Sequence, residues 1–233
     1  MKIVIIDDER DILEGLQSYL KSNHFEVDIF LSGKDFLQQK NISTYDLIIL
    51  DVMMPDIDGL EVCRNLRKKT NTPIIFLSAA GESFDRILGI EMGADDYITK
   101  PFNPREVLVR IKSILRRCDT IQDSISEYIT TPFWKIDTQF RSIIYLSGKK
   151  QSFTAALYQM FEYLYKNKSQ LVCRERVYID LLRRDFEEFD RTIDIRVSRL
   201  RKMLDVRPEN QSYIKTVKGY GYILDLDDEY TTS

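Results

Sequence analysis

Short apolar runs rich in β-branched residues recur through the first half of the chain. The five runs are residues 2–6, 27–30, 47–50, 74–77 and 97–99. Between them, apolar residues recur every three or four positions, as at Ile12, Leu13, Leu16 and Leu20. Strands buried on both faces of a parallel sheet read as continuous apolar runs, and their alternation with helices is typical of α/β proteins. The pattern therefore predicts a doubly wound, five-stranded parallel sheet within residues 1–117.

Four of the five runs end in side chains that can bind or react. These side chains are Asp7, Asp8, Asp51, Ser78 and Lys100. Each aspartate alone is more typical of a turn or a helix cap. The carboxyl ends of parallel strands, however, meet at one edge of the sheet, where ligands bind. The joint placement therefore predicts one site.

Three carboxylates that meet at one point repel one another unless a cation neutralises them. Aspartate oxygens suit Mg²⁺, which is held by one or two carboxylates together with water and phosphate oxygens. Lys100 could bind an incoming phosphoryl group as a point charge, and the Ser78 hydroxyl could donate to it. The set predicts transfer of a phosphoryl group to an aspartate, with Mg²⁺ as cofactor.

Charge divides the chain into an acidic half and a basic half. Residues 1–120 hold 16 Lys and Arg against 20 Asp and Glu, a net charge of −4, whereas residues 128–224 hold 18 against 11, a net charge of +7. A basic domain indicates a polyanion as its partner. Three scattered cysteines and the lack of a long apolar segment are typical of a cytoplasmic protein with no membrane partner.

Segment 191–204 predicts an amphipathic helix with a basic outer face. Its core stripe consists of Ile193, Val197, Leu200 and Leu204. The opposite side holds Arg191, Ile195, Ser198, Arg199 and Lys202. Such a face suits the DNA major groove, where arginines reach phosphates or guanine edges and an aliphatic side chain touches a thymine methyl. The alternative is an ordinary solvated charged face.

The remainder of the basic half predicts short strands, two more helices and a C-terminal hairpin. One helix is expected from a Thr154 cap to Tyr165, a second from about Arg174, and the hairpin turns at 218–221. Helix, turn, basic helix and hairpin form the layout of a winged helix, whose wing places a cation at the minor groove. The expected divisions of the chain are a first domain 1–117, a polar linker 118–130, a winged-helix domain 131–226 and an acidic tail 227–233.

Four segments of the first domain resemble the receiver domain of two-component response regulators. They are IIDDE, ILDVMMPDIDG, the Ser78–Ala79 pair and GADDYITKPF. The resemblance implies a flavodoxin-like fold with strand order 2-1-3-4-5 and makes Asp51 the phosphoacceptor. It also implies a Mg²⁺ pocket formed by Asp7, Asp8, Asp51 and the backbone carbonyl of Met53.

The same resemblance implies how phosphorylation at the site changes other parts of the domain. Lys100 binds the phosphoryl group and precedes a cis peptide bond to Pro101, while Ser78 turns toward that group and leaves space for Tyr97 to rotate inward. In the OmpR/PhoB subfamily, the face made by the fourth helix, fifth strand and fifth helix dimerises. Three opposite-charge combinations fall on it: Arg86–Glu106, Glu91–Lys112 and Asp96–Arg110. A homodimer is expected on phosphorylation; the alternative is a solvated helix surface.

The second domain resembles the OmpR/PhoB-type DNA-binding domain through the segments RTIDIRVSRLRKML and YIKTVKGYGYIL. The positions that match the family's DNA contacts are Arg191, Arg196, Ser198, Arg199, Arg201, Thr216 and, at the wing tip, Lys218. Loop 183–190, which in relatives can touch RNA polymerase, is unusually acidic toward its end in this chain.

The expected function is that of a transcriptional regulator. Phosphorylated on Asp51 by a histidine kinase, it would dimerise and bind tandem half-sites in double-stranded promoter DNA, with RNA polymerase as a further partner. One alternative is an enzyme that forms an aspartyl-phosphate with small molecules, but such enzymes usually need a second carboxylate two residues after the nucleophile, where this chain has Met53. The other is a regulator with a vestigial receiver, against which the complete set of site residues argues.

Overall fold

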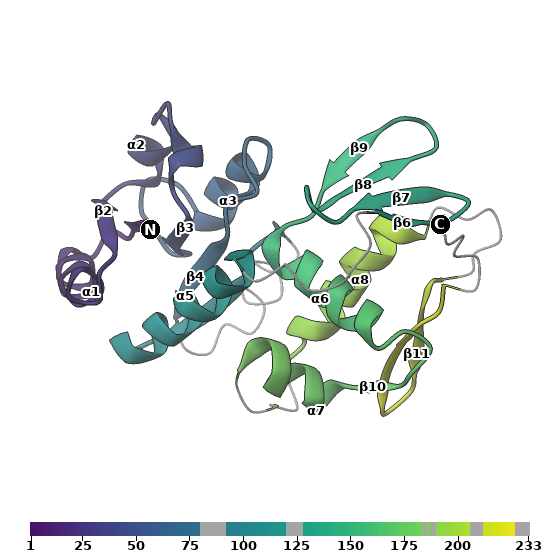
Figure 1. Cartoon of the computed structure of the whole chain (residues 1–233). Helices are drawn as coiled ribbons and strands as arrows, with labels where there is room; N and C mark the ends of the chain where they lie inside the picture. The colour runs from purple at the N-terminus through teal and green to yellow at the C-terminus, as the bar shows by residue number, and fades with distance from the viewer. Residues whose placement is uncertain (80–91, 120–127, 184–185, 187–189, 206–211, 227–233) are drawn as a thin grey trace. The chain divides into compact units, whose positions relative to one another are not determined.

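The computed structural model describes residues 1–79, 92–119, 128–183, 186, 190–205 and 212–226. The chain divides into two compact units, Met1–Asp119 and Thr120–Ser233 (Figure 1). The last helix of the first unit ends at Asp119 and the first strand of the second begins at Tyr128. The expected linker, 118–130, therefore overlaps regular structure at both of its ends. In the part of the chain that is described, every helix is too short or too polar to cross a bilayer.

A five-stranded parallel sheet of order β2-β1-β3-β4-β5 forms the centre of the first unit. Its strands are β1 (Lys2–Ile6), β2 (Glu26–Phe30), β3 (Leu47–Asp51), β4 (Ile74–Ala79) and β5 (Asp96–Lys100). This order confirms the one that the resemblance to receiver domains implied. Every residue of the central strand β3 is buried, as expected for a strand covered on both faces.

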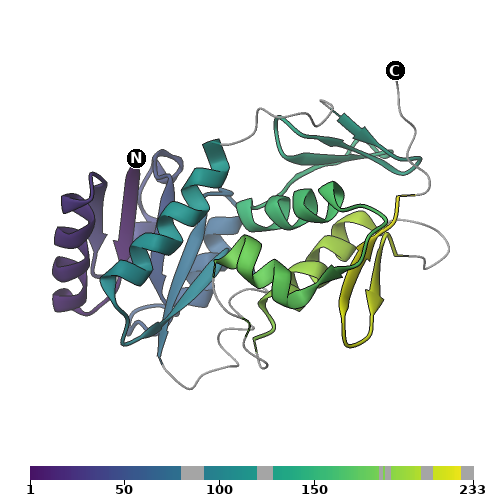
Figure 2. The same ribbon diagram turned by 60° about the horizontal axis from the view of Figure 1, so that its bottom comes forward.

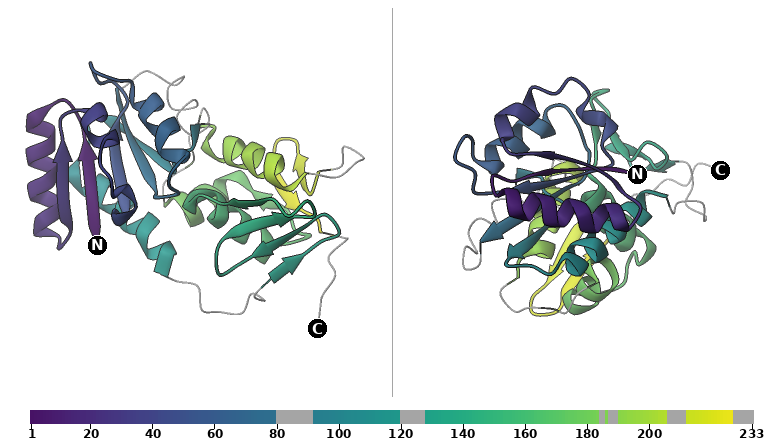
Figure 3. Two further views of the ribbon diagram at one scale, coloured as in Figure 1. Left: turned by 90° about the horizontal axis from the view of Figure 1, so that it is seen from above. Right: turned by 90° about the vertical axis from the view of Figure 1, so that its left-hand side faces the viewer.

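Helices cover both faces of this sheet. They are α1 (Arg10–Ser22), α2 (Gly33–Leu37), α3 (Gly59–Arg67) and α5 (Pro104–Asp119), with a 3₁₀ turn at Ile42–Thr44. α1 and α5 lie on one face, and α2 and α3 lie on the other (Figure 3, right). The side chains of Ser32 and Asp58 cap α2 and α3 by accepting backbone N–H groups. The expected helix around 86–92 falls outside the described residues except for Met92.

In its described residues, the second unit combines antiparallel sheets with helices (Figure 2). The first sheet joins β6 (Tyr128–Thr130), β7 (Trp134–Asp137), β8 (Ser142–Tyr145) and β9 (Lys150–Ser152), and the second has the order β10-β12-β11, from Val172–Cys173, Gly221–Leu224 and Ile214–Val217. The helices are α6 (Ala155–Lys166), α7 (Arg174–Val177) with the π-helical turn η2 (Tyr178–Leu182), and α8 (Thr192–Leu204). α6 begins after Thr154 as predicted, but the Thr154 side chain makes no capping bond.

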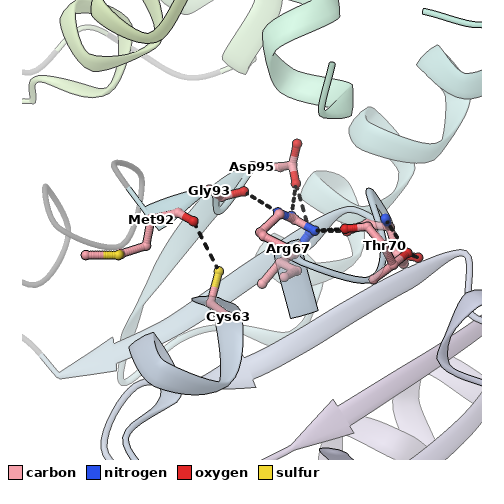
Figure 4. Close-up of polar contacts among 8 residues, drawn as sticks. Cys63, Arg67, Thr70, Met92, Gly93 and Asp95 are labelled. Carbon is pink, nitrogen blue, oxygen red and sulfur yellow. Dashed lines mark hydrogen bonds and ion pairs between the residues drawn. The ribbon is translucent and has the colours of Figure 1, made fainter. Parts of the chain in front are cut away.

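Arg67, at the end of α3, fixes the segment that leads into β5. Its guanidinium donates to the Gly93 carbonyl at 2.9 Å, to the Thr72 carbonyl at 2.7 Å and to the Asp95 carboxylate at 2.9 Å (Figure 4). The Asp95 carboxylate also accepts the backbone N–H of Ile74, the first residue of β4. The Arg67 and Asp95 side chains are 11% and 1% exposed, so little water screens this pair. The amino ends of β4 and β5 are therefore held together by one guanidinium.

Candidate functional site

The three aspartates predicted from the strand ends converge at the carboxyl edge of the sheet. One carboxylate oxygen from each of Asp7, Asp8 and Asp51 lies within 4.8 Å of the others. Asp7 and Asp51 are buried, whereas Asp8 is exposed. Hard carboxylate oxygens at this separation match the ligands that Mg²⁺ prefers. The donor set therefore fits a divalent cation.

Lys100 reaches into this cluster from the end of β5. Its Nζ lies 2.8 Å from Oδ2 of Asp7, 3.2 Å from Oδ2 of Asp51 and 3.0 Å from Oε1 of Glu9. The peptide bond between Lys100 and Pro101 is cis, as the family resemblance implied. Glu9 was not among the predicted site residues, although its position directly after the Asp7–Asp8 pair was a signal for it.

Burial dominates the electrostatics of the cluster. Burial and then the charge of Asp7 raise the pKa of Asp51 to about 6. Burial likewise raises the pKa of Asp7, although Lys100 opposes this effect. Burial alone would lower the pKa of Lys100, but hydrogen bonds to Asp7 and Glu9 hold it above its usual value. One ammonium therefore does not neutralise the cluster, and a bound cation would relieve the remaining repulsion.

Ser78 presents a buried hydroxyl without a partner among the described residues. The side chain is 1% exposed and its Oγ makes no hydrogen bond. A buried hydroxyl left unpaired costs roughly 1–3 kcal/mol, so an oxygen acceptor that reached it would remove this cost. Tyr97, the other predicted switch residue, is 4% exposed. The Met53 side chain is 59% exposed, and the role of its carbonyl stays a prediction.

Three of the charged residues expected to join two protomers, Asp96, Glu106 and Arg110, are paired within one chain. Nη1 of Arg110 lies 2.9 Å from Oδ2 of Asp96, and Nη2 lies 2.7 Å from Oε1 of Glu106. Glu106 precedes Arg110 by one helical turn, and Asp96 begins the neighbouring strand, so both carboxylates are within reach. The Asp96–Arg110 combination is thus intrachain in this structure. Two other expected dimer residues, Arg86 and Glu91, lie outside the described part of the chain.

The buried residues of α8 confirm the predicted core stripe, but the residues exposed on its outer face differ from the prediction. The stripe residues Ile193, Val197, Leu200 and Leu204 all belong to the core of the second unit. Arg196 is only 3% exposed, because it lies one turn from both Ile193 and Leu200 at the border of the stripe. Ile195 is also buried, contrary to the expectation of an exposed aliphatic side chain. The other predicted DNA-contacting residues are exposed or half-buried: Arg191, Ser198, Arg199, Arg201, Thr216 and Lys218.

Residues that the sequence did not single out hold α8 in place. At its C-terminal end, Nε1 of Trp134 donates to the Leu204 carbonyl at 2.9 Å, and the Tyr145 hydroxyl donates to the Met203 carbonyl at 3.1 Å. These bonds satisfy carbonyls that a helix end leaves without partners.

A second group of residues holds the first turn of α8. The Asp194 carboxylate there binds Nε of Arg174 at 3.0 Å and accepts the Tyr222 hydroxyl. Nη2 of Arg174 also donates to the Tyr222 oxygen at 3.3 Å. This triad ties α8 to the beginning of α7 and to β12.

Comparison with known proteins matches both units of the chain. Residues 3–112 match the response regulator receiver domain, and residues 148–224 match the family described as transcriptional regulatory protein, C terminal. The chain is 37% identical over 224 residues to the transcriptional regulatory protein CpxR homolog of Haemophilus influenzae, covering 96% of this chain and 98% of that protein. It is 35% identical over 232 residues to the alkaline phosphatase synthesis transcriptional regulatory protein PhoP of Bacillus subtilis, covering 96% of each.

A solved structure extends the likeness to the whole fold. The response regulator DrrB of Thermotoga maritima, an OmpR/PhoB homologue, has a TM-score of 0.52 and 31% identity over 96% of this chain and 98% of its own. The fold and the family matches together define the class of this protein, which is a receiver domain joined to the DNA-binding domain of a transcription regulator. Within that class, the chain belongs to the OmpR/PhoB family of two-component response regulators.

Proposed function

We propose that Asp51 accepts a phosphoryl group from a histidine kinase and that this phosphorylation controls binding to promoter DNA. The convergence of three carboxylates with Lys100 at the carboxyl edge of the sheet is the observation that carries the proposal. With a pKa of about 6, Asp51 is mostly ionised at neutral pH, so it can act as a nucleophile without a base to deprotonate it.

Each site residue has a separate task in this reaction. A carboxylate oxygen of Asp51 attacks the phosphorus, an O–P bond forms, and the bond to the donor's imidazole nitrogen breaks. Mg²⁺, held by Asp7, Asp8, Asp51 and the Met53 carbonyl, would neutralise charge on the transferred group. Lys100 exchanges part of its contact with Asp51 for a phosphoryl oxygen, and the unpaired Ser78 hydroxyl donates to another.

The output is a shift in the population of receiver conformations. Movement of Ser78 toward the phosphoryl group changes the packing of Tyr97 and favours dimerisation through the face that includes β5 and α5. A dimer presents two DNA-binding domains to tandem half-sites, so that binding gains avidity without a new contact in either domain.

Phosphorylation is expected to lower the dissociation constant for the promoter region upstream of the protein's own gene by at least tenfold. The reason is the effective concentration of the second domain once the first has bound. Quantitative footprinting with and without acetyl phosphate measures the change. Equal affinity in both states would favour the regulator with a vestigial receiver.

Charge reversal at the dimer face should weaken the activated dimer. Lys112 is exposed on α5, and Lys112→Glu should raise the dimer dissociation constant about tenfold, because each change acts twice in a two-fold dimer and surface pairs contribute up to about 1 kcal/mol. Light scattering in Mg²⁺ and beryllofluoride, a phosphoryl analogue, measures it. Lys40→Glu, also at an exposed position, is the matched control. A receiver that remains monomeric when activated would contradict the dimer proposal itself.

A further inference from the structure

Arg201, in the last turn of α8, is bonded to the C-terminal hairpin of its own chain. Its Nε and Nη2 donate to the Ile214 carbonyl at 2.9 and 2.5 Å, and Nη2 also donates to Oγ1 of Thr216 at 2.6 Å. Its Cζ lies 6.0 Å from the centre of the Tyr222 ring. The guanidinium thus contacts both strands of the hairpin formed by β11 and β12.

This placement changes the role expected for Arg201 and Thr216. Both lie at positions where relatives contact DNA, yet here each is a hydrogen-bond partner of the other. Among the hydrogen bonds of the described residues, Nε and Nη2 of the guanidinium bind the hairpin and only Nη1 does not. The planar fork of arginine suits such a two-nitrogen contact, and a charged donor makes it stronger than a neutral hydrogen bond.

Arg201 is one of several contacts that fix the hairpin, since the backbone N–H of Arg174 donates to the Tyr220 carbonyl at 3.2 Å and the Tyr222 hydroxyl donates to Asp194. β12 pairs with β10 over only two residues, Val172 and Cys173, and these partners lie at Tyr222 and Gly221. Lys218, at the tip, has an exposed side chain. The side-chain bonds between α8 and the hairpin add to this pairing: Asp194 binds β12 through Tyr222, and Arg201 supplies the bonds to β11.

We propose that Arg201 and Thr216 are positioning residues that hold the hairpin on α8, so that the helix and the wing tip meet DNA as one rigid unit. This inference rests on the proposed binding of DNA by the second unit. It differs from the family-based expectation in a measurable way, since a residue that neutralises a phosphate contributes to the salt dependence of binding, whereas a positioning residue does not.

Arg201→Ala is expected to weaken DNA binding about tenfold at fixed salt, a change of about 1.4 kcal/mol, because a hairpin released from the helix must be ordered again when DNA binds. The slope of log affinity against log salt concentration should stay at the wild-type value. Arg201→Lys should not restore affinity, because an ammonium lacks the planar fork. Lys218→Ala is the matched control: it removes one positive charge at the exposed tip and should reduce the slope by about 0.9 per protomer.

Hydrogen exchange without DNA separates this inference from the function on which it rests. In Arg201→Ala, the amides of Ile214–Leu224 should exchange at least tenfold faster than in the wild type, whether or not the protein binds DNA. Failure of the wild type to bind DNA would remove the proposed function and leave this result standing. Unchanged exchange in the variant would overturn the positioning role.

Thr216→Val provides a second route if Arg201→Ala does not fold. This change removes the acceptor hydroxyl without altering charge, so affinity should fall and the salt slope should not. In the double variant, the two losses should be less than additive, because both changes break the same contact. A reduced slope in Arg201→Ala that Arg201→Lys restores, or additive losses in the double variant, would show direct phosphate contacts and overturn the proposal.

Discussion

Asp51→Asn should abolish incorporation of phosphate from acetyl phosphate while leaving the receiver folded. The amide that replaces the carboxylate has no charged oxygen to attack phosphorus, and Asp7, the other buried carboxylate of the cluster, stays paired with Lys100 at 2.8 Å. Mass spectrometry of the intact protein measures incorporation. Asp35→Asn, at an exposed aspartate of α2, is the matched control and should incorporate phosphate as the wild type does. Persistent incorporation in Asp51→Asn would show that another residue is the phosphoacceptor.

The same variant should also be more stable at neutral pH. In the folded state the pKa of Asp51 is raised from 3.8 to about 6, so ionisation of this group removes folding stability as the pH rises from about 4 to 6. Asn does not ionise. In Mg²⁺-free buffer, its free energy of unfolding at pH 7 should exceed that of the wild type by about 1–3 kcal/mol, and the difference should shrink toward pH 4. Urea unfolding at both pH values tests the sign; a variant less stable at pH 7 would contradict it.

Gly59→Ala should disrupt the site because the added Cβ would collide with the backbone of Asp51 and Val52. A Cβ at Gly59 would lie 2.0 Å from the Asp51 carbonyl oxygen and 2.9 Å from Cα of Val52, and neither is a flexible side-chain end. The start of α3 would have to move away from Asp51 and the loop that follows it. We expect a loss of about 3 kcal/mol or more in stability, at the upper end of overpacking costs, together with weaker Mg²⁺ binding. Urea unfolding and isothermal titration with Mg²⁺ measure the two effects.

The chain offers a matched control in Gly15. This glycine lies within α1, and a Cβ added there would meet nothing within 4 Å. Gly15→Ala should therefore stabilise the protein by about 1 kcal/mol through helix propensity and leave Mg²⁺ binding unchanged. If both alanine variants lost stability equally, the effect at Gly59 could not be attributed to its close approach to Asp51.

The sequence predicted those features whose signals are local. An apolar run followed by aspartate identifies both a buried strand and the side chain at its end, so the sheet order and the residues that converge near Asp51 followed from the pattern and the family resemblance. The core stripe of α8 followed from helical spacing in the same way. In these cases the residue and its environment are encoded within a few positions of each other.

Partners that are distant along the chain were not predictable in this way. Glu9 meets Lys100 across 91 positions, and Trp134 meets Leu204 across 70, so no periodicity connects them. Helical spacing also could not decide whether Arg201 points to DNA or to the hairpin, because side-chain direction depends on the acceptors nearby. The capping role expected for Thr154 failed for a similar reason: the pattern locates the start of the helix but not the rotamer.

The Arg67 contacts at the amino ends of β4 and β5 have a mechanical consequence. Asp95 joins Arg67 to the backbone of Ile74, whereas Ser78 and Lys100 lie at the opposite ends of the same two strands. Two strands that are fixed at their amino ends can move most at their carboxyl ends. A displacement caused by a phosphoryl group should thus bend the carboxyl ends of β4 and β5 without sliding one strand along the other. Tyr97 lies between the Arg67 contacts and these carboxyl ends.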